Sequence, residues 1–232
     1  MSMLSGVEVE SYVLEDHCCI TFLIPHYSQY EIKHGLRIEL QGGAKVLSKA
    51  SLPLGFNLEA VMEDYDNIMM PECLCAIRRA LVAYYDRLEQ HEDLKKMLNM
   101  EAQLFRMLDS SHMQITFLMK NEIDQEMEPF DLELQLDYRL YDIRPKKITF
   151  NDDELPEGAA DLLREQCMVF KRKPLKKAFK EAFINNCGPF IFVQQVGVRE
   201  VSQRRPRNSR TNRHWNNDDT YLPEYSEQSD DA

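Results

Sequence analysis

Thiols are among the side chains most often used for catalysis or for metal binding, and this chain has several. The six cysteines are Cys18, Cys19, Cys73, Cys75, Cys167 and Cys187. No two of them form the Cys-x-x-Cys pair that is typical of zinc sites. We therefore expect reduced cysteines that mostly pack in the interior, in a reducing compartment.

Imidazoles and carboxylates are scattered in the same way. None of the six histidines has a second histidine four residues later, as a helical metal site would require. The acidic run Asp152, Asp153 and Glu154 lacks the ligand spacing of a calcium loop, and Asp152 or Asp153 is expected to cap a helix that starts near Pro156. We expect no catalytic or metal site, no cofactor, no small-molecule substrate and no enzymatic activity.

The densest charge in the chain is basic, although the formal net charge is −11. It lies on Lys171, Arg172, Lys173, Lys176, Lys177 and Lys180. Leu175, Phe179 and Phe183 recur every four residues and should face a core, which would leave this basic face in solvent. Two interpretations stay open: a solvated helix face, or a docking surface for an acidic partner or for DNA.

The end of the chain differs from the rest in composition. After residue 193, an arginine-rich stretch at 199–213 precedes an acidic stretch, a pattern typical of disorder. The arginines could contact DNA phosphates, direct the protein to the nucleus or be solvated. A membrane-spanning helix needs about 18 consecutive apolar residues, and no segment comes close to this, so membrane insertion is not expected. Glu8 and Glu10 do not fit a signal peptide, so secretion is not expected either.

These residues are positioned by a pattern of predicted strands and helices that occurs twice in the sequence. In the first copy, strands are predicted at 7–13, 17–24, 30–41 and 44–52, with a tight turn at Gly42 and Gly43. No Gly-Lys-Ser/Thr follows these glycines, so a phosphate loop is not expected. Asn57 should cap a helix at 58–65, and Pro71 should open a helix that runs to about residue 98. Leu74, Ile77, Leu81, Tyr84 or Tyr85, and Leu88 form its apolar stripe, and its opposite, wet side carries Arg78, Arg79, Asp86, Arg87 and Glu89.

The second copy repeats this order. Residues 100–108 have helical spacing, with Leu104, Met107 and Leu108 on one side. Strands follow at 113–119, 130–141 and 147–150. The helix near Pro156 would bury Leu162, Leu163, Cys167 and Phe170, and Pro174 would start the next helix. Residues 190–193 are either an edge strand or an apolar strip on this module.

Period-two alternation followed by amphipathic helices predicts an α+β protein in which each sheet has one face covered by helices. We predict one module at 1–99, a second at 100–193 and a charged, disordered tail at 194–232.

Four stretches carry a resemblance to a known family. They are Leu4-Ser5-Gly6 leading into the Cys18-Cys19 strand, Leu52-Pro53-Leu54 followed by Leu58-Glu59, the helix at 73–87 with its tyrosine pair, and Arg172-Lys173-Pro174-Leu175 followed by Ala178-Phe179. Over about residues 4–184 the chain resembles the centromere protein O (Mcm21) family of inner kinetochore subunits, which contain two RWD domains.

The resemblance implies two tandem RWD-like modules and a non-enzymatic subunit of the constitutive centromere-associated network. Such a subunit lies in the nucleus at the centromere and supports chromosome segregation in mitosis. It pairs with a centromere protein P-like double RWD subunit, then with Q/U-like subunits, and meets centromeric chromatin mostly indirectly.

The alternative is an RWD-type accessory protein of the ubiquitin pathway, because ubiquitin-conjugating enzymes resemble each module in layout. Those enzymes carry a His-Pro-Asn stretch before the reactive cysteine, and no His-Pro occurs in this chain. Cys73 and Cys75 are accordingly expected to be core residues rather than nucleophiles.

Overall fold

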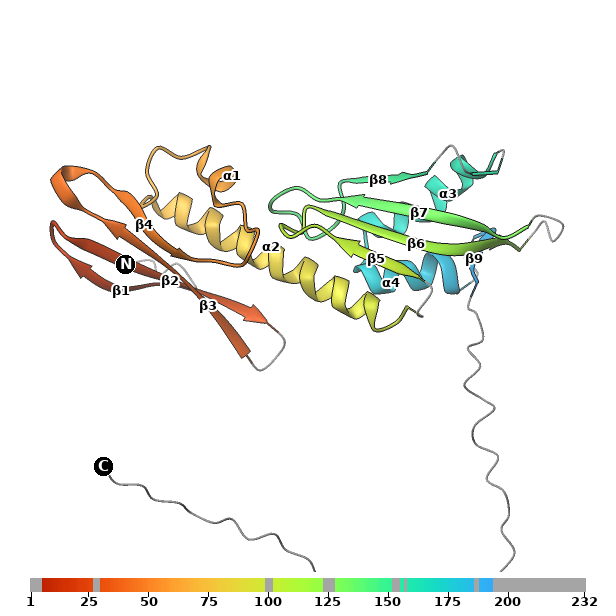
Figure 1. The fold of residues 1–232 in the computed structure, drawn as a ribbon, viewed down its shortest axis with the longest axis horizontal. Coiled ribbons are helices and arrows are strands. Elements are labelled where there is room, and N and C mark those ends of the chain that lie inside the picture. Colours follow the sequence, from red (N-terminus) through yellow and green to blue (C-terminus); the bar gives the residue numbers. More distant parts are fainter. Residues whose placement is uncertain are drawn as a thin grey trace, which may run out of the picture. The chain divides into compact units, whose positions relative to one another are not determined.

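The computed structural model describes residues 6–26, 30–98, 102–122, 128–151, 155–156, 158–185 and 188–193, all within one compact unit. These residues form two antiparallel sheets with helices (Figure 1), which confirms the predicted α+β class. The boundaries at residues 99 and 193 stay predictions, and the tail lies outside the described residues.

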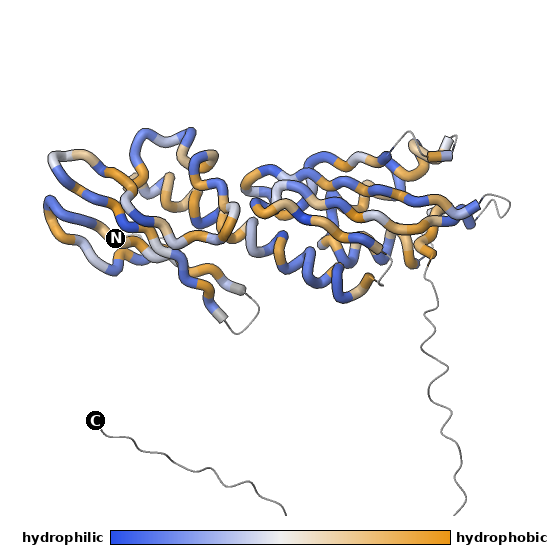
Figure 2. Tube along the Cα trace, viewed as in Figure 1, coloured by the Kyte–Doolittle hydropathy of each residue, from blue (hydrophilic) through white to orange (hydrophobic). Residues whose placement is uncertain are grey.

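The first sheet consists of four strands in chain order: β1 (Val7–Val13), β2 (His17–His26), β3 (Tyr30–Glu39) and β4 (Val46–Ser51). The four predicted strands are confirmed to within two residues at each end. Cys18, Ile20, Phe22 and Ile24 of β2 are buried in the core. Figure 2 shows hydrophobic and hydrophilic residues interspersed along the strands. Gly42 and Gly43 both have positive φ, as the predicted turn between β3 and β4 requires.

The long helix α2 covers one face of this sheet, and the short helix α1 packs against α2. Asn57 caps α1 (Leu58–Met62), since its side-chain oxygen accepts a hydrogen bond from the Ala60 amide at 3.0 Å. Pro71 opens α2 (Pro71–Lys95), where its missing amide hydrogen costs nothing. The first core joins β2 and β3 to Leu74, Ile77 and Leu81 of α2.

The second sheet contains β5 (Gln103–Arg106), β6 (His112–Asn121), β7 (Phe130–Asp137), β8 (Lys147–Phe150) and β9 (Phe190–Phe192). The strands predicted at 113–119 and 147–150 are confirmed, whereas β7 ends at Asp137 rather than at residue 141. Of the two alternatives for 190–193, the edge strand is correct, because β9 pairs with β6.

The helix predicted over 100–108 is wrong. Its described part contains β5, which pairs Leu104 with Ile115 of β6, while Met107 and Leu108 are exposed. A short apolar segment fits helical spacing and strand spacing equally well, and here pairing with β6 decides the outcome.

The second sheet is covered by α3 (Ala159–Cys167), η3 (Met168–Lys171), α4 (Leu175–Phe179) and the π-helical turn η4 (Lys180–Ile184). Pro174 precedes α4, and Leu175, Phe179 and Phe183 are buried as predicted. The Phe117 ring of β6 lies 5.0 Å from the Phe179 ring and 5.1 Å from the Phe183 ring, between centroids.

The start of α3 and its apolar stripe differ from the prediction. The helix begins at Ala159 rather than near Pro156, and Gly158 occupies its N-cap in the left-handed region. Asp152 and Asp153, which were expected to cap it, lie outside the described residues. Leu162 is 47% exposed, whereas Leu163, Cys167 and Phe170 are buried. The apolar stripe is therefore narrower than predicted and leaves Leu162 beside it.

The end of α2 belongs to the second core. Leu94 packs with residues of the second sheet, and the Gln90 side-chain oxygen accepts a hydrogen bond from the Leu175 amide at 2.8 Å. In the opposite direction, Leu140 and Tyr141 after β7 pack on the first core. One helix thus contributes to both hydrophobic cores.

Arg87 corrects a prediction about the wet side of α2. Its side chain is 2% exposed, and its Nη1 donates to the carbonyl oxygens of Arg139 at 3.3 Å, Leu140 at 3.4 Å and Asp142 at 2.8 Å. Local periodicity could not foresee this position, because the segment that buries Arg87 comes some fifty residues later.

Candidate interaction surface

The predicted basic face lies on the segment that covers the second sheet. Lys171 ends η3, Lys176 and Lys177 belong to α4, and Lys180 begins η4. Five of the six basic residues are exposed and Lys176 is partly buried. Because Leu175, Phe179 and Phe183 fill the core, the charged side chains remain at the surface, as the spacing predicted.

Most of this positive charge has no counter-ion among the described residues. Lys173 pairs with Glu181, an exposed ion pair that stabilises the fold little. Lys171, Arg172, Lys176, Lys177 and Lys180 form no ion pair with the part of the chain that the structure describes. A cluster of unpaired like charges attracts an oppositely charged partner over roughly a Debye length, about 8 to 10 Å.

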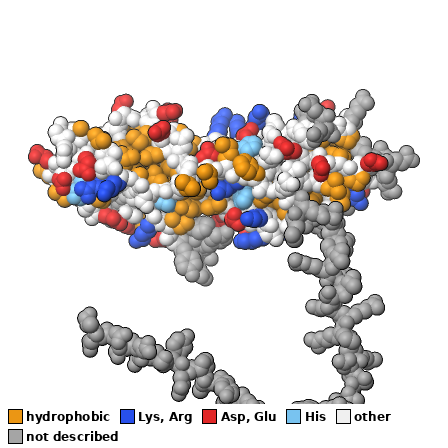
Figure 3. Space-filling view, viewed as in Figure 1, with side chains coloured by type: hydrophobic (Ala, Val, Ile, Leu, Met, Phe, Trp, Pro, Cys, Tyr) orange, Lys and Arg blue, Asp and Glu red, His pale blue; other side chains and the backbone are white. Residues whose placement is uncertain are grey.

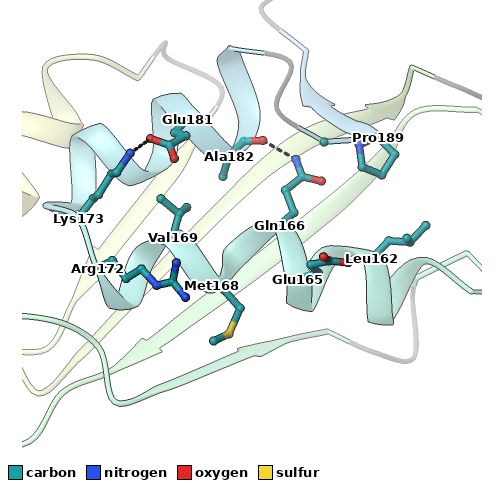
Figure 4. Close-up of a pocket in the computed structure, with 11 residues that line it drawn as sticks. Leu162, Glu165, Gln166, Met168, Val169, Arg172, Lys173, Glu181, Ala182 and Pro189 are labelled. Carbon is teal, nitrogen blue, oxygen red and sulfur yellow. Dashed lines mark hydrogen bonds and ion pairs between the residues drawn. The ribbon is translucent and has the colours of Figure 1, made fainter.

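A cavity of about 490 Å³ lies beside the basic face (Figure 4). Residues of α3 and η3 line one side of it, and residues of η4 line the other. We call it the Arg172 groove, and it is lined by the apolar side chains Leu162, Met168, Val169, Ala182 and Pro189 and by the polar or charged side chains Glu165, Gln166, Arg172, Lys173 and Glu181. Arg172 and Lys173 were predicted as site residues, and the groove brings them together. The other four predicted residues, Lys171, Lys176, Lys177 and Lys180, do not line the groove.

The apolar half of the groove was missed from the sequence. Leu162 was assigned to the core, and Met168 and Pro189 were given no role in a site. Leu162 and Met168 are 47% and 44% exposed. In the sequence, the only sign of these two residues was that they are apolar and lie outside the buried stripe of the helix. Single apolar residues of this kind are common on protein surfaces and do not by themselves indicate a site.

Gln166 holds one wall of the groove. Its Nε2 donates to the Phe190 carbonyl at 2.6 Å and also to the Ala182 carbonyl, and its Oε1 accepts from the Phe190 amide at 3.4 Å. A Cβ at Gly188 would lie 2.4 Å from this amide group, so a side chain there would push Gln166 aside. Gln166 therefore ties α3 to η4 and β9.

The cysteines behave as packing residues. Cys18, Cys73 and Cys167 are buried, Cys19 and Cys75 are partly buried, and Cys187 lies outside the described residues. Burial raises the pKa of the Cys18, Cys73 and Cys167 thiols above the ordinary value. A raised pKa keeps a thiol protonated at neutral pH, which is the opposite of an activated nucleophile.

The described histidines make separate contacts. His112 Nδ1 lies 2.7 Å from Asp137 Oδ1, and His34 Nε2 lies 2.7 Å from the Tyr85 hydroxyl. Within the described ranges, no group of three or more His, Cys, Asp or Glu side chains is placed to hold a metal ion. Within the same ranges, no helix combines the length and apolar character needed to cross a bilayer.

No family model and no curated protein matches the chain. The following proposal therefore rests on the fold, the surface and the family resemblance of the sequence.

Proposed function

We propose that this protein is a non-enzymatic structural subunit of the inner kinetochore, built from two tandem RWD-like modules. It acts in the nucleus at the centromere, pairs with a centromere protein P-like double RWD subunit and, with it, receives Q/U-like subunits. The observation that carries the proposal is the repeated order of an antiparallel sheet in chain order, β1 to β4 and β5 to β8, each followed by helices on one face (Figure 1).

Physical features of the described surface support a binding role. β1 and β4 are edge strands of the first sheet and β8 is an edge of the second, and an edge strand offers unpaired backbone groups to a partner. Figure 3 shows hydrophobic side chains gathered on the face in view. Exposed hydrophobic side chains that gather in this way often mark an interface.

Co-expression tests the proposal directly. The chain and a centromere protein P-like subunit should elute together from gel filtration as a stoichiometric complex, and a tagged copy should collect at centromeres in dividing cells. A chain that stays partner-free and is absent from centromeres would rule the proposal out.

A charge-reversed variant tests the basic face within the same experiment. Lys176→Glu, Lys177→Glu and Lys180→Glu together should weaken the complex, mostly by slowing association. The matched control is Lys33→Glu, Lys45→Glu and Lys49→Glu, which changes the net charge equally at exposed positions of the first module. Equal effects of the two triple variants would show that only the net charge of the chain matters.

A further inference from the structure

The Arg172 groove combines an apolar wall with a cation at its edge. Its apolar wall includes Leu162 and Met168, both nearly half exposed. Its edge carries Arg172, an exposed cation without an ion-pair partner among the described residues. In Figure 4, Met168 begins η3, Arg172 directly follows η3, and Leu162 lies on α3.

The volume and the lining of the groove define what can enter it. About 490 Å³ exceeds the volume of one large apolar side chain, and burying such a side chain there would favour binding. The Gln166 hydrogen bonds to Ala182 and Phe190 hold the wall in place, so an occupant would meet a preformed surface.

The charges around the groove select the rest of the occupant. Lys177 precedes Glu181 by four residues and therefore shares its side of the helical segment. Lys173 already pairs with Glu181, which leaves Arg172 and Lys177 to attract an acidic partner. Nucleic acid fits less well, because a phosphate backbone has no apolar side chain to fill the groove.

We infer that the Arg172 groove binds an acidic segment of a protein partner that inserts one large apolar side chain against Leu162 and Met168 and pairs its carboxylates with Arg172 and Lys177. The inference rests on the proposed role of the chain as a binding subunit, and it adds the place and the chemistry of one contact.

The test uses the full chain and fluorescein-labelled synthetic peptides in which one central leucine, phenylalanine or tryptophan is flanked by glutamates. Binding is followed by fluorescence anisotropy at low and high salt. We expect Arg172→Glu to weaken binding of the best peptide about tenfold. We expect Leu162→Ser to weaken it about fivefold, because an apolar contact is lost.

Matched controls separate the groove from general effects. Lys45→Glu makes the same kind of charge reversal elsewhere, and Leu54→Ser removes another exposed leucine; both should leave peptide affinity unchanged. A peptide with serine in place of its apolar residue should bind more weakly and should be insensitive to Leu162→Ser, which closes a double-mutant cycle. Leu162 and Arg172 are surface positions, and circular dichroism will verify that the variants fold.

Three results would overturn the inference: no binding of any acidic peptide, equal binding of the serine peptide, or displacement by a short DNA duplex whose own affinity depends on both Leu162 and Arg172. Peptide binding without centromere localisation would remove the kinetochore assignment and leave the groove intact. Co-elution with a centromere protein P-like subunit without peptide binding would support the kinetochore assignment and remove the inference about the groove.

Discussion

Arg87 places a positive charge where water cannot reach it, and burial accordingly lowers its pKa. Three backbone carbonyls accept hydrogen bonds from its Nη1, and the guanidinium carbon lies 5.8 Å from the centre of the Tyr138 ring. Its Nε has no hydrogen-bond partner in the described part of the chain. The site therefore compensates the desolvation of the guanidinium mainly with carbonyl dipoles rather than with a salt bridge.

Replacing Arg87 should destabilise the fold. Arg87→Ala leaves the carbonyls of Arg139, Leu140 and Asp142 without this donor, and we expect the free energy of unfolding to fall by about 2 to 3 kcal/mol. Lys95→Ala, at an exposed position of the same helix, should change it by less than about 0.5 kcal/mol. Urea unfolding followed by circular dichroism measures both values, and equal effects would mean that the Arg87 contacts are unimportant.

His91 should make stability depend on pH. Burial lowers the pKa of His91, and the carboxylate of Glu92, whose Oε1 lies 3.2 Å from Nδ1, offsets this only in part. The unfolded chain then binds a proton more readily than the folded chain. The contribution of His91 to the free energy of unfolding is therefore fully present above the unfolded pKa of about 6.5. It is lost as the pH falls from there toward the lowered pKa of the folded state.

The measurement is the free energy of unfolding in urea at about pH 7.5 and about pH 5.5. His91→Gln should reduce the loss of stability between the two values, because the buried proton-binding site is gone. An unchanged loss in this variant would assign the pH dependence to other groups.

At the scale of elements, strand and helix positions were predicted well wherever the apolar period was long. The alternation around Ile38 and Leu134 and the long stripe of α2 leave little ambiguity. β5 was missed because four residues cannot establish a period, and the start of α3 was missed because Gly158 caps it through its backbone conformation rather than with a side chain. Arg172 and Lys173 of the groove were predicted from the charge cluster, whereas Glu165, Glu181 and the apolar part of the groove depend on how α3 meets η4.

The attachment of β9 to α3 should depend on Gln166. Gln166→Ala removes the hydrogen bonds to both backbone groups of Phe190, so amide hydrogens of β9 should exchange with solvent faster, by roughly tenfold for about 1.4 kcal/mol of lost local stability. Glu165→Ala, at the exposed neighbouring position, is the control and should leave exchange in β9 unchanged. Hydrogen exchange with mass spectrometry gives the answer, and equal exchange in the two variants would contradict it.

At the scale of the whole molecule, α2 makes the predicted boundary at residue 99 an unfavourable place to cut the chain. Leu94 is fully buried in the second core, and Gln90 bonds the start of α4. A fragment of residues 100–193 lacks both contacts, whereas a fragment of residues 86–193 retains them.

We expect the shorter fragment to unfold at lower urea concentration, with a loss of about 2 to 4 kcal/mol relative to the longer one, typical of removing a buried leucine. Leu94→Ala in the longer fragment should reproduce most of that loss. Identical urea midpoints for the two fragments would show that the second core does not need the end of α2. The sequence alone could not place Leu94, because a helix stripe does not reveal which sheet it faces.

The pairing of β6 sets an order for assembly during synthesis. β5 and β9 both pair with β6 at different points along it, and β7 pairs with it throughout most of its length. Nearly all residues of the first core have been synthesised once Lys95 has been added, and N-terminal units generally fold first. The second sheet, in contrast, waits for Phe190 to Phe192, so a nascent chain stalled before this point carries an unfinished β-edge and is the species that chaperones must shield.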